Sequence, residues 1–155
     1  MTEASATGTL EQALAHATRL LDRNPALATE QLDEILQVAE GHPAALRLLA
    51  RARSIQGDVP GALQILMPLA QNQPTWALLH FDLGVALGRA GRGQQAIDAL
   101  RRAVALKPDL PQAWRELGDH LLAAGEQEAA DAAYANHVRH STRDPRLIEA
   151  AIALA

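Results

Sequence analysis

The sequence predicts an all-α fold built from about four helical hairpins. Residues of one type recur at an interval of 34, which is typical of repeat proteins whose unit is a helix pair. They are Gly57, Gly91 and Gly125, then Leu49, Leu83 and Leu117, then Ala62, Ala96 and Ala130. The composition agrees, because 48% of the residues are hydrophobic and only 3% aromatic, which leaves Ala and Leu, the best helix formers, to build the core. Each of these glycines is expected in a loop of only a few residues between two helices. Helices joined by so short a loop must be antiparallel neighbours.

The first repeat is expected at residues 9–42, after a disordered N-terminus at residues 1–8. It is degenerate. Four of its residues keep the phase of the later repeats: Ala15, Ala28, Leu32 and Ile35. The glycine turn is replaced by Arg23, Asn24 and Pro25. Thr9 and Gln12 have the spacing of a capping box, which predicts that the first helix begins at Thr9.

Three clearer repeats follow at residues 43–76, 77–110 and 111–144. The last of these shows the pattern best. Pro111 suits the first helical turn, where its missing amide hydrogen costs nothing, and Asp109 is expected to cap the helix. One apolar stripe should then consist of Trp114, Leu117, Leu121 and Leu122.

The ends and crossing points of the helices are also predicted. Gly125 suits the left-handed position that ends a helix. The second helix of the same repeat should bury Ala129, Ala130, Ala133 and Tyr134. Small residues recur inside the first helices, at Ala50, Gly84 and Gly118. A glycine inside a helix costs about 0.5 to 1 kcal/mol relative to alanine, so we expect the paired helices to approach closely there.

Residues 145–155 are expected to form a terminal helix or the start of a truncated repeat, because Pro145 lies 34 residues after Pro111. This segment is mostly apolar, and its only charged residues are Arg146 and Glu149. A terminal helix of a solenoid needs a polar outer face. The segment therefore predicts a continuation of the stack or a homodimer through the C-terminal end, unless its apolar residues all face inward as a short cap.

These positions resemble the signature of the tetratricopeptide repeat family. In the last repeat the matching residues are Trp114, Leu117, Gly118, Leu121, Ala130 and Tyr134, with Leu121 in place of the usual tyrosine. In the repeat before it they are His80, Leu83, Gly84, Leu87, Ala96, Leu100, Ala103 and Pro108. The resemblance covers about two thirds of the chain. It implies a right-handed superhelical solenoid of antiparallel helix pairs.

The resemblance also implies where a partner binds, because the first helix of each pair lines the concave groove in this family. The corresponding residues are Arg47, Arg51, Leu78, Phe81, Val85, Arg89, Gln112, Arg115 and Asp119. They combine an apolar middle with surrounding arginines, which favours a protein or peptide partner with an acidic or amphipathic segment. Arg47 and Arg51 repel each other at a spacing of four, and an acidic ligand would relieve this. The alternative is that these arginines are simply solvated, with Arg115 paired to Asp119.

Composition and motifs argue against other functions. The net charge of -4 gives no general attraction to nucleic acid or to anionic lipid. The chain has no cysteine and no apolar run of membrane-spanning length, and residues 1–9 lack the pattern of a signal peptide, so we expect a cytoplasmic protein. Of the six histidines, only His137 and His140 have a helical spacing, and they lack a third ligand. No phosphate loop or nucleophile motif occurs, so we expect no enzyme activity, catalytic residue, metal site or cofactor.

Three functions remain open after this reading. The chain is a self-contained binding scaffold, or the N-terminal part of a larger bacterial enzyme, or a module that self-associates through its apolar terminal helix. The second is suggested because residues 129–155 loosely resemble the region before the transferase domain in tetratricopeptide-linked sulfotransferases.

Overall fold

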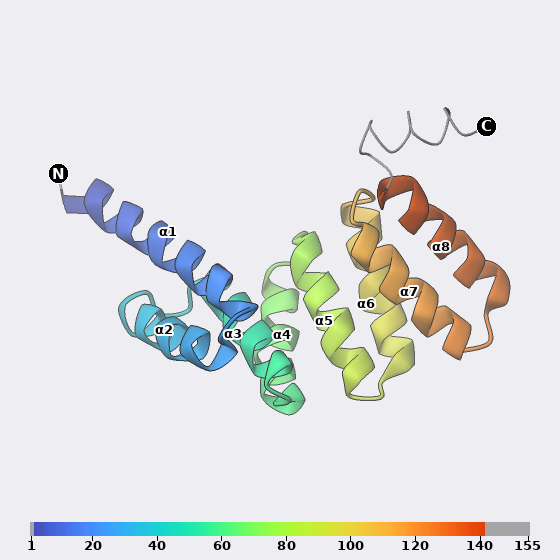
Figure 1. Ribbon diagram of the computed structural model, residues 1–155, viewed down its shortest axis with the longest axis horizontal. Coiled ribbons are helices and arrows are strands. Elements are labelled where there is room, and N and C mark those ends of the chain that lie inside the picture. The colour runs from blue at the N-terminus through green and yellow to red at the C-terminus, as the bar shows by residue number, and fades with distance from the viewer. Residues whose placement is uncertain (1, 142–155) are drawn as a thin grey trace. The chain divides into compact units, whose positions relative to one another are not determined.

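A computed structural model describes residues 2–141, and this part of the chain contains eight α-helices and no strand (Figure 1). The helices are α1 (Thr2–Leu21), α2 (Pro25–Val38), α3 (Pro43–Ile55), α4 (Val59–Asn72), α5 (Ala77–Arg89), α6 (Gly93–Leu106), α7 (Pro111–Ala123) and α8 (Gln127–Ser141). The predicted all-α helical-repeat fold is confirmed. The expected segment at residues 145–155 lies outside the described residues.

The chain divides into two compact units between Pro74 and Thr75. Helices α1 to α4 form the first unit and α5 to α8 the second, so each unit holds two helix pairs. The sequence pattern, which runs on in one phase across this point, gave no sign of the division. Each unit is described below by itself.

The first unit has its own core of Ala, Leu and Ile side chains. Its fully or nearly buried residues are Ala17, Leu21, Ala28, Leu32, Ile35, Ala45, Leu48, Leu49 and Ala52, from α1, α2 and α3. Helix α1 packs on α2, α2 packs on α3 and α3 packs on α4. Helix α1 also touches α3. On α2, three residues of the degenerate repeat keep the phase of the later repeats: Ala28, Leu32 and Ile35. All three lie in this core.

The second unit contains a matching core that follows the predicted stripes closely. Its buried residues are Ile97, Leu100, Ala103, Val104, Leu110, Ala113, Leu117, Leu121, Ala130 and Ala133. Trp114, Ala129 and Tyr134 are partly buried against it, as expected. Leu122 is the exception, since 47% of this residue is exposed. Consecutive residues of a helix point in different directions, so Leu122 does not face the core as its neighbour Leu121 does. The prediction that Leu122 belongs to the core is wrong.

Glycine turns end three of the first helices, as the spacing predicted. Positive φ angles of 89°, 74° and 80° occur at Gly57, Gly91 and Gly125. At the middle turn, the Arg92 amide donates to the Leu87 carbonyl at 2.9 Å and the Gly91 amide donates to the Gly88 carbonyl at 3.1 Å. These two bonds satisfy the last free carbonyls of α5 in the arrangement that requires a left-handed residue.

Replacing Gly91 with Ala is expected to lower the free energy of unfolding by about 1 to 2 kcal/mol, because a side chain disfavours the left-handed backbone by this amount. Gly93 is a matched control. Neither glycine has an atom within 4 Å of an added Cβ, and the φ of Gly93 lies outside the left-handed region. Gly93→Ala should therefore be neutral or stabilising by up to about 1 kcal/mol. Urea unfolding followed by circular dichroism would measure both, and equal effects would contradict the explanation.

Two predicted helix starts differ from the structure. Helix α1 begins at Thr2, so it includes residues 2–8 as well as Thr9, where the capping box predicted the start. No proline interrupts this stretch, and adding a residue to an existing helix gains one hydrogen bond. At α7, the N-cap position falls on Leu110, which makes no side-chain cap bond, one residue after Asp109.

The turn between α1 and α2 works without glycine. Asn24 takes the N-cap position, and its side-chain oxygen accepts from the Leu27 amide at 3.1 Å. The Asn24 amide donates to the Leu20 carbonyl at 2.7 Å, which ends α1. Pro25 then occupies the first turn of α2. An asparagine cap followed by proline therefore replaces the glycine turn of the later repeats.

Candidate functional site

The nine residues predicted to bind a partner fall into two groups. Arg47 and Arg51 lie on α3 in the first unit. The other seven lie on α5 and α7 in the second unit: Leu78, Phe81, Val85, Arg89, Gln112, Arg115 and Asp119. The structure thus brings seven of the nine predicted residues into one unit.

The two predicted arginines of α3, Arg47 and Arg51, are half-buried. The Nε atom of Arg47 is closed off from solvent, so part of its guanidinium group is packed against protein. Near the end of the same helix, Ile55 is 45% exposed. The positive charge of Arg47 and Arg51 is therefore partly buried, and the same helix carries an exposed apolar residue.

In the second unit, α5 and α7 lie on the inner side of a bend. Helix α5 packs against α6 and α7, and α7 packs against α8. Helices α6 and α8, both described, do not pack against each other. Because the first helices of the two pairs touch and the second helices do not, the two pairs bend toward α5 and α7. This is the concave side that repeat proteins commonly use for binding.

We call this surface the α5–α7 face and define it by eight residues. They are Leu78, Phe81, Val85 and Arg89 on α5, with Gln112, Arg115, Asp119 and Leu122 on α7. Seven of them were predicted from the sequence. Leu122 was missed because it was assigned to the core. Its distance of seven residues from Arg115, two helical turns, could have placed it on this face.

The α5 half of the face is apolar and well supported. Leu78 and Phe81 are partly buried against the core of the second unit, and Val85 is half-buried. Arg89 is exposed at the end of the helix. At Gly88, an added Cβ would clash with Nε2 of His120, so α5 and α7 meet closely at this point. The packing behind Leu78 and Phe81 holds the apolar strip in place.

Apart from Leu122, the α7 half of the face is polar, with Gln112, Arg115 and Asp119 all exposed. Arg115 forms an ion pair with Glu116 at 3.7 Å. The carboxylate of Asp119 accepts a hydrogen bond of 2.6 Å from the hydroxyl of Tyr134. The pairing of Arg115 with Asp119, considered as an alternative from their spacing, is not found in the described structure.

A gap in α7 allows Tyr134 to reach Asp119. A Cβ placed on Gly118 would lie 2.6 Å from the Tyr134 ring, so only glycine leaves space for that ring against the helix. Gly84 has the same relation to Leu100, whose Cγ lies 2.6 Å from an added Cβ. The space left by each glycine is therefore filled by a side chain of the paired helix, where the sequence had predicted a close approach of the two helix backbones. In the α7–α8 pair, the side chain that fills the gap is Tyr134, and its polar hydroxyl group lies beside Asp119.

The pKa of Tyr134 is raised above the usual tyrosine value of 10.0, first by its hydrogen bond to Asp119, then by desolvation and by the charges of Asp119 and Asp131. Because the folded pKa is the higher one, this contribution to stability is complete below pH 10.0 and is lost as the pH rises through the folded pKa. Tyr134 is the only tyrosine in the chain, so a tyrosinate absorbance titration reports on it alone.

Asp119→Asn is expected to lower the pKa of Tyr134 toward 10.0, because a neutral amide accepts the Tyr134 hydrogen bond more weakly than a carboxylate and carries no charge that disfavours tyrosinate. Asp98→Asn, on α6, is the matched control and should leave the titration unchanged. Tyr134→Phe should remove the corresponding loss of stability at alkaline pH. A titration that is the same in wild type and Asp119→Asn would contradict the hydrogen bond seen in the structure.

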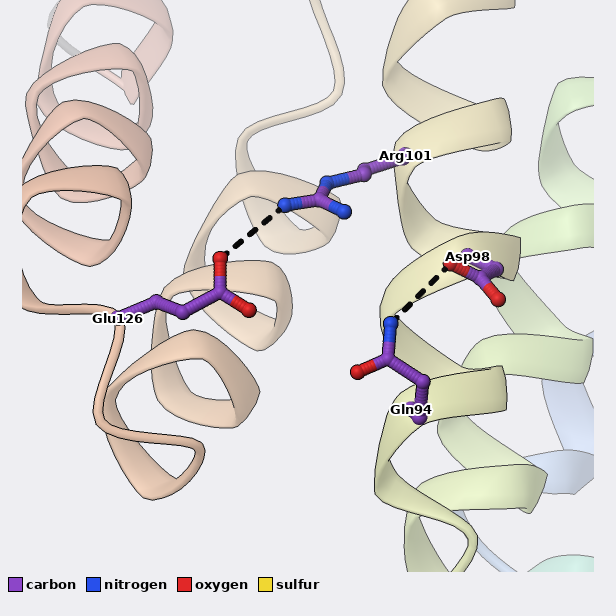
Figure 2. A network of polar contacts seen from close by, with 4 residues as sticks. All are labelled: Gln94, Asp98, Arg101 and Glu126. Atoms are coloured by element: carbon purple, nitrogen blue, oxygen red, sulfur yellow. Dashed lines mark hydrogen bonds and ion pairs between the residues drawn. The ribbon is translucent and has the colours of Figure 1, made fainter.

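Polar contacts on α6 look like those of a solvated surface (Figure 2). Arg101 pairs with Glu126, in the turn before α8, at 3.5 Å, and both side chains are nearly half-exposed. Gln94 donates to Asp98 one turn along α6, at 3.5 Å. Exposed pairs of this kind contribute about 0 to 1 kcal/mol. Only the Arg101–Glu126 pair links α6 to the turn of the next helix pair, since Gln94 and Asp98 both lie on α6.

The described residues offer little else for a chemical site. No group of three or more His, Cys, Asp or Glu side chains in this part of the chain could hold a metal ion. Among the same residues, no helix has both the length and the apolar character needed to cross a membrane.

Comparisons with known proteins agree with this architecture. Residues 81–145 match the family model of the tetratricopeptide repeat. A crystal structure of MamA has a TM-score of 0.73 and 18% identity, covering 88% of this chain and 81% of that chain. A MamA RS-1 double mutant has a TM-score of 0.75 and 17% identity, covering 88% of this chain and 78% of that chain. A MamA AMB-1 structure has a TM-score of 0.66 and 22% identity, covering 90% of this chain and 77% of that chain. A comparison with curated proteins gives no match. The fold is therefore a tetratricopeptide-type helical repeat.

Proposed function

We propose that this tetratricopeptide-type chain is a non-enzymatic scaffold that binds a protein or peptide segment on the α5–α7 face. The observation that carries the proposal is the combination of an apolar strip, supported from behind by the core, with exposed charges around it. Leu78, Phe81 and Val85 form the strip, and Arg89 and Arg115 stand beside it. Such a surface suits an amphipathic segment, whose apolar side covers the strip while its acidic residues meet the arginines.

Magnitudes indicate which contacts matter most. Burying apolar surface contributes about 25 cal/mol per Å², so an apolar side chain that covers Val85 or Leu122 adds about 1 to 3 kcal/mol. An exposed ion pair to Arg89 or Arg115 adds about 0 to 1 kcal/mol. We therefore expect the apolar strip to supply most of the affinity and the arginines to orient the partner. Arg47 and Arg51 of α3 are proposed as further contacts of the same kind in the first unit.

The proposal is tested by selecting binders from a displayed library of random short peptides against the full chain. Leu122→Gln should weaken the selected peptides by about threefold to tenfold, since it removes exposed apolar surface from the face. Val138→Gln is the matched control, because Val138 is also exposed, at 57%, but lies on α8. Peptides that bind the Leu122→Gln variant as well as wild type would contradict this function.

The other functions considered from the sequence gain no support from the comparisons. Neither the tetratricopeptide family model nor the MamA structures point to a sulfotransferase. Self-association through residues 145–155 rests on a segment outside the described residues, and light scattering of the chain would test it. A cytoplasmic location and the absence of nucleic-acid and membrane partners remain proposals that rest on the net charge of -4 and the composition.

A further inference from the structure

The α7 end of the α5–α7 face carries a negative charge that no cation among the described residues balances. Asp119 is exposed, and its polar partner in this part of the chain is the neutral hydroxyl of Tyr134. Arg115, four residues earlier on the same helix, pairs with Glu116 instead. An exposed carboxylate that already accepts one hydrogen bond keeps its second oxygen available for another donor.

This charge is special to one of the two helices. Asp119 occupies the position on α7 that Val85 occupies on α5, 34 residues earlier. The two residues behind them differ in the same way. Leu100 fills the gap at Gly84 and has no polar atom on its side chain, whereas Tyr134 fills the gap at Gly118 and brings a hydroxyl to the face. The face is thus apolar along α5 and has a fixed acceptor on α7.

We propose that the α5–α7 face selects a partner segment that places an arginine or lysine side chain on Asp119, next to apolar residues that cover Val85 and Leu122. This inference rests on the proposed function and names the chemistry of its ligand. Charge complementarity supports it, because both the free carboxylate oxygen of Asp119 and the lone pairs of the Tyr134 oxygen accept hydrogen bonds, so the matching group must donate. A purely acidic segment would meet repulsion here.

Tyr134 acts as a positioning residue in this arrangement. Its hydroxyl donates to one oxygen of Asp119 at 2.6 Å and so fixes the orientation of the carboxylate. The phenol is protonated at neutral pH, as any tyrosine is, and so it can donate to Asp119 there. A cation that binds beside Asp119 lowers the pKa of Tyr134, because it offsets the charge that raised it. The single tyrosine makes this shift measurable.

The test uses peptides selected on the full wild-type chain, in which each arginine or lysine is then changed to glutamine. We expect one such change to weaken binding about twofold to fivefold on wild type and on the control variant Asp98→Asn. The same change should have no effect on Asp119→Asn, whose amide keeps an acceptor for Tyr134. Binding of the unmodified peptide should also lower the pKa of Tyr134 in the tyrosinate titration.

Two results would overturn the inference, and they differ. If the peptides depend on Leu122 but their basic residue contributes equally to binding wild type and the Asp119→Asn variant, the face binds a partner without selecting a cation. If no selected peptide depends on Leu122, the proposed function itself fails, and the selection for a cation fails with it.

Discussion

Leu100→Ala is expected to lower the free energy of unfolding of the second unit by about 2 to 5 kcal/mol, the range for deleting a buried leucine side chain. Leu100 is fully buried, and it fills the gap against Gly84. Urea unfolding followed by circular dichroism would measure the change. Leu122→Ala is the matched control, because Leu122 is 47% exposed and its loss should cost about 0.5 kcal/mol or less.

The gap at Gly84 makes this prediction sharper. Gly84→Ala alone should destabilise by about 1 to 3 kcal/mol, since the new Cβ would lie 2.6 Å from Cγ of Leu100. In the Leu100→Ala background that clash is gone, and the better helix propensity of alanine should make the same change neutral or stabilising by up to about 1 kcal/mol. Additive effects of the two substitutions would contradict the packing of α5 on α6.

Trp114→Ala should have the second largest effect, about 2 to 4 kcal/mol, because the partly buried ring packs on the core of the second unit. Its indole nitrogen also donates to the Pro108 carbonyl at 2.7 Å, which ties α7 to the turn that precedes it. Trp114→Phe keeps most of the packing and removes this bond, at an expected cost of about 0.5 to 1.5 kcal/mol. The difference between the two variants, measured by urea unfolding, separates packing from hydrogen bonding. Equal losses would show that the ring contributes nothing beyond its hydrogen bond.

The repeat itself could be predicted from the sequence because glycine has few substitutes where φ is positive. Gly57, Gly91 and Gly125 mark the turns directly, and the buried residues between them follow the helical period. Close packing at Gly84 and Gly118 was also predictable, because a glycine inside a helix costs stability that packing must offset.

Helix starts were harder to predict, because several residues near a start can act as the cap. Thr9 has the right spacing for a capping box, yet the helix continues back to Thr2, and at α7 the cap position falls on Leu110 instead of Asp109. The division between Pro74 and Thr75 was not predicted either, since the 34-residue phase runs through it without a break. The 34-residue phase shows where each repeat lies along the chain. It says little about which neighbouring repeats pack together into one compact unit.

The candidate site was predictable in position but not in pairing. Spacing placed Arg115 and Asp119 on one face, and both are exposed there. Spacing also suggested that they pair, whereas Arg115 contacts Glu116 and Asp119 contacts Tyr134. Tyr134 comes from another helix through the gap at Gly118, a contact between residues 15 apart in sequence that no pattern within one helix reveals.

The most direct test of the account is to map a selected peptide on the chain by nuclear magnetic resonance. Binding on the α5–α7 face predicts that the largest shift changes fall on Val85, Leu122 and their neighbours on α5 and α7, with little change on α6. Largest changes on the outer surface of α6, around Asp98 and Arg101, would contradict the assignment of function to this face.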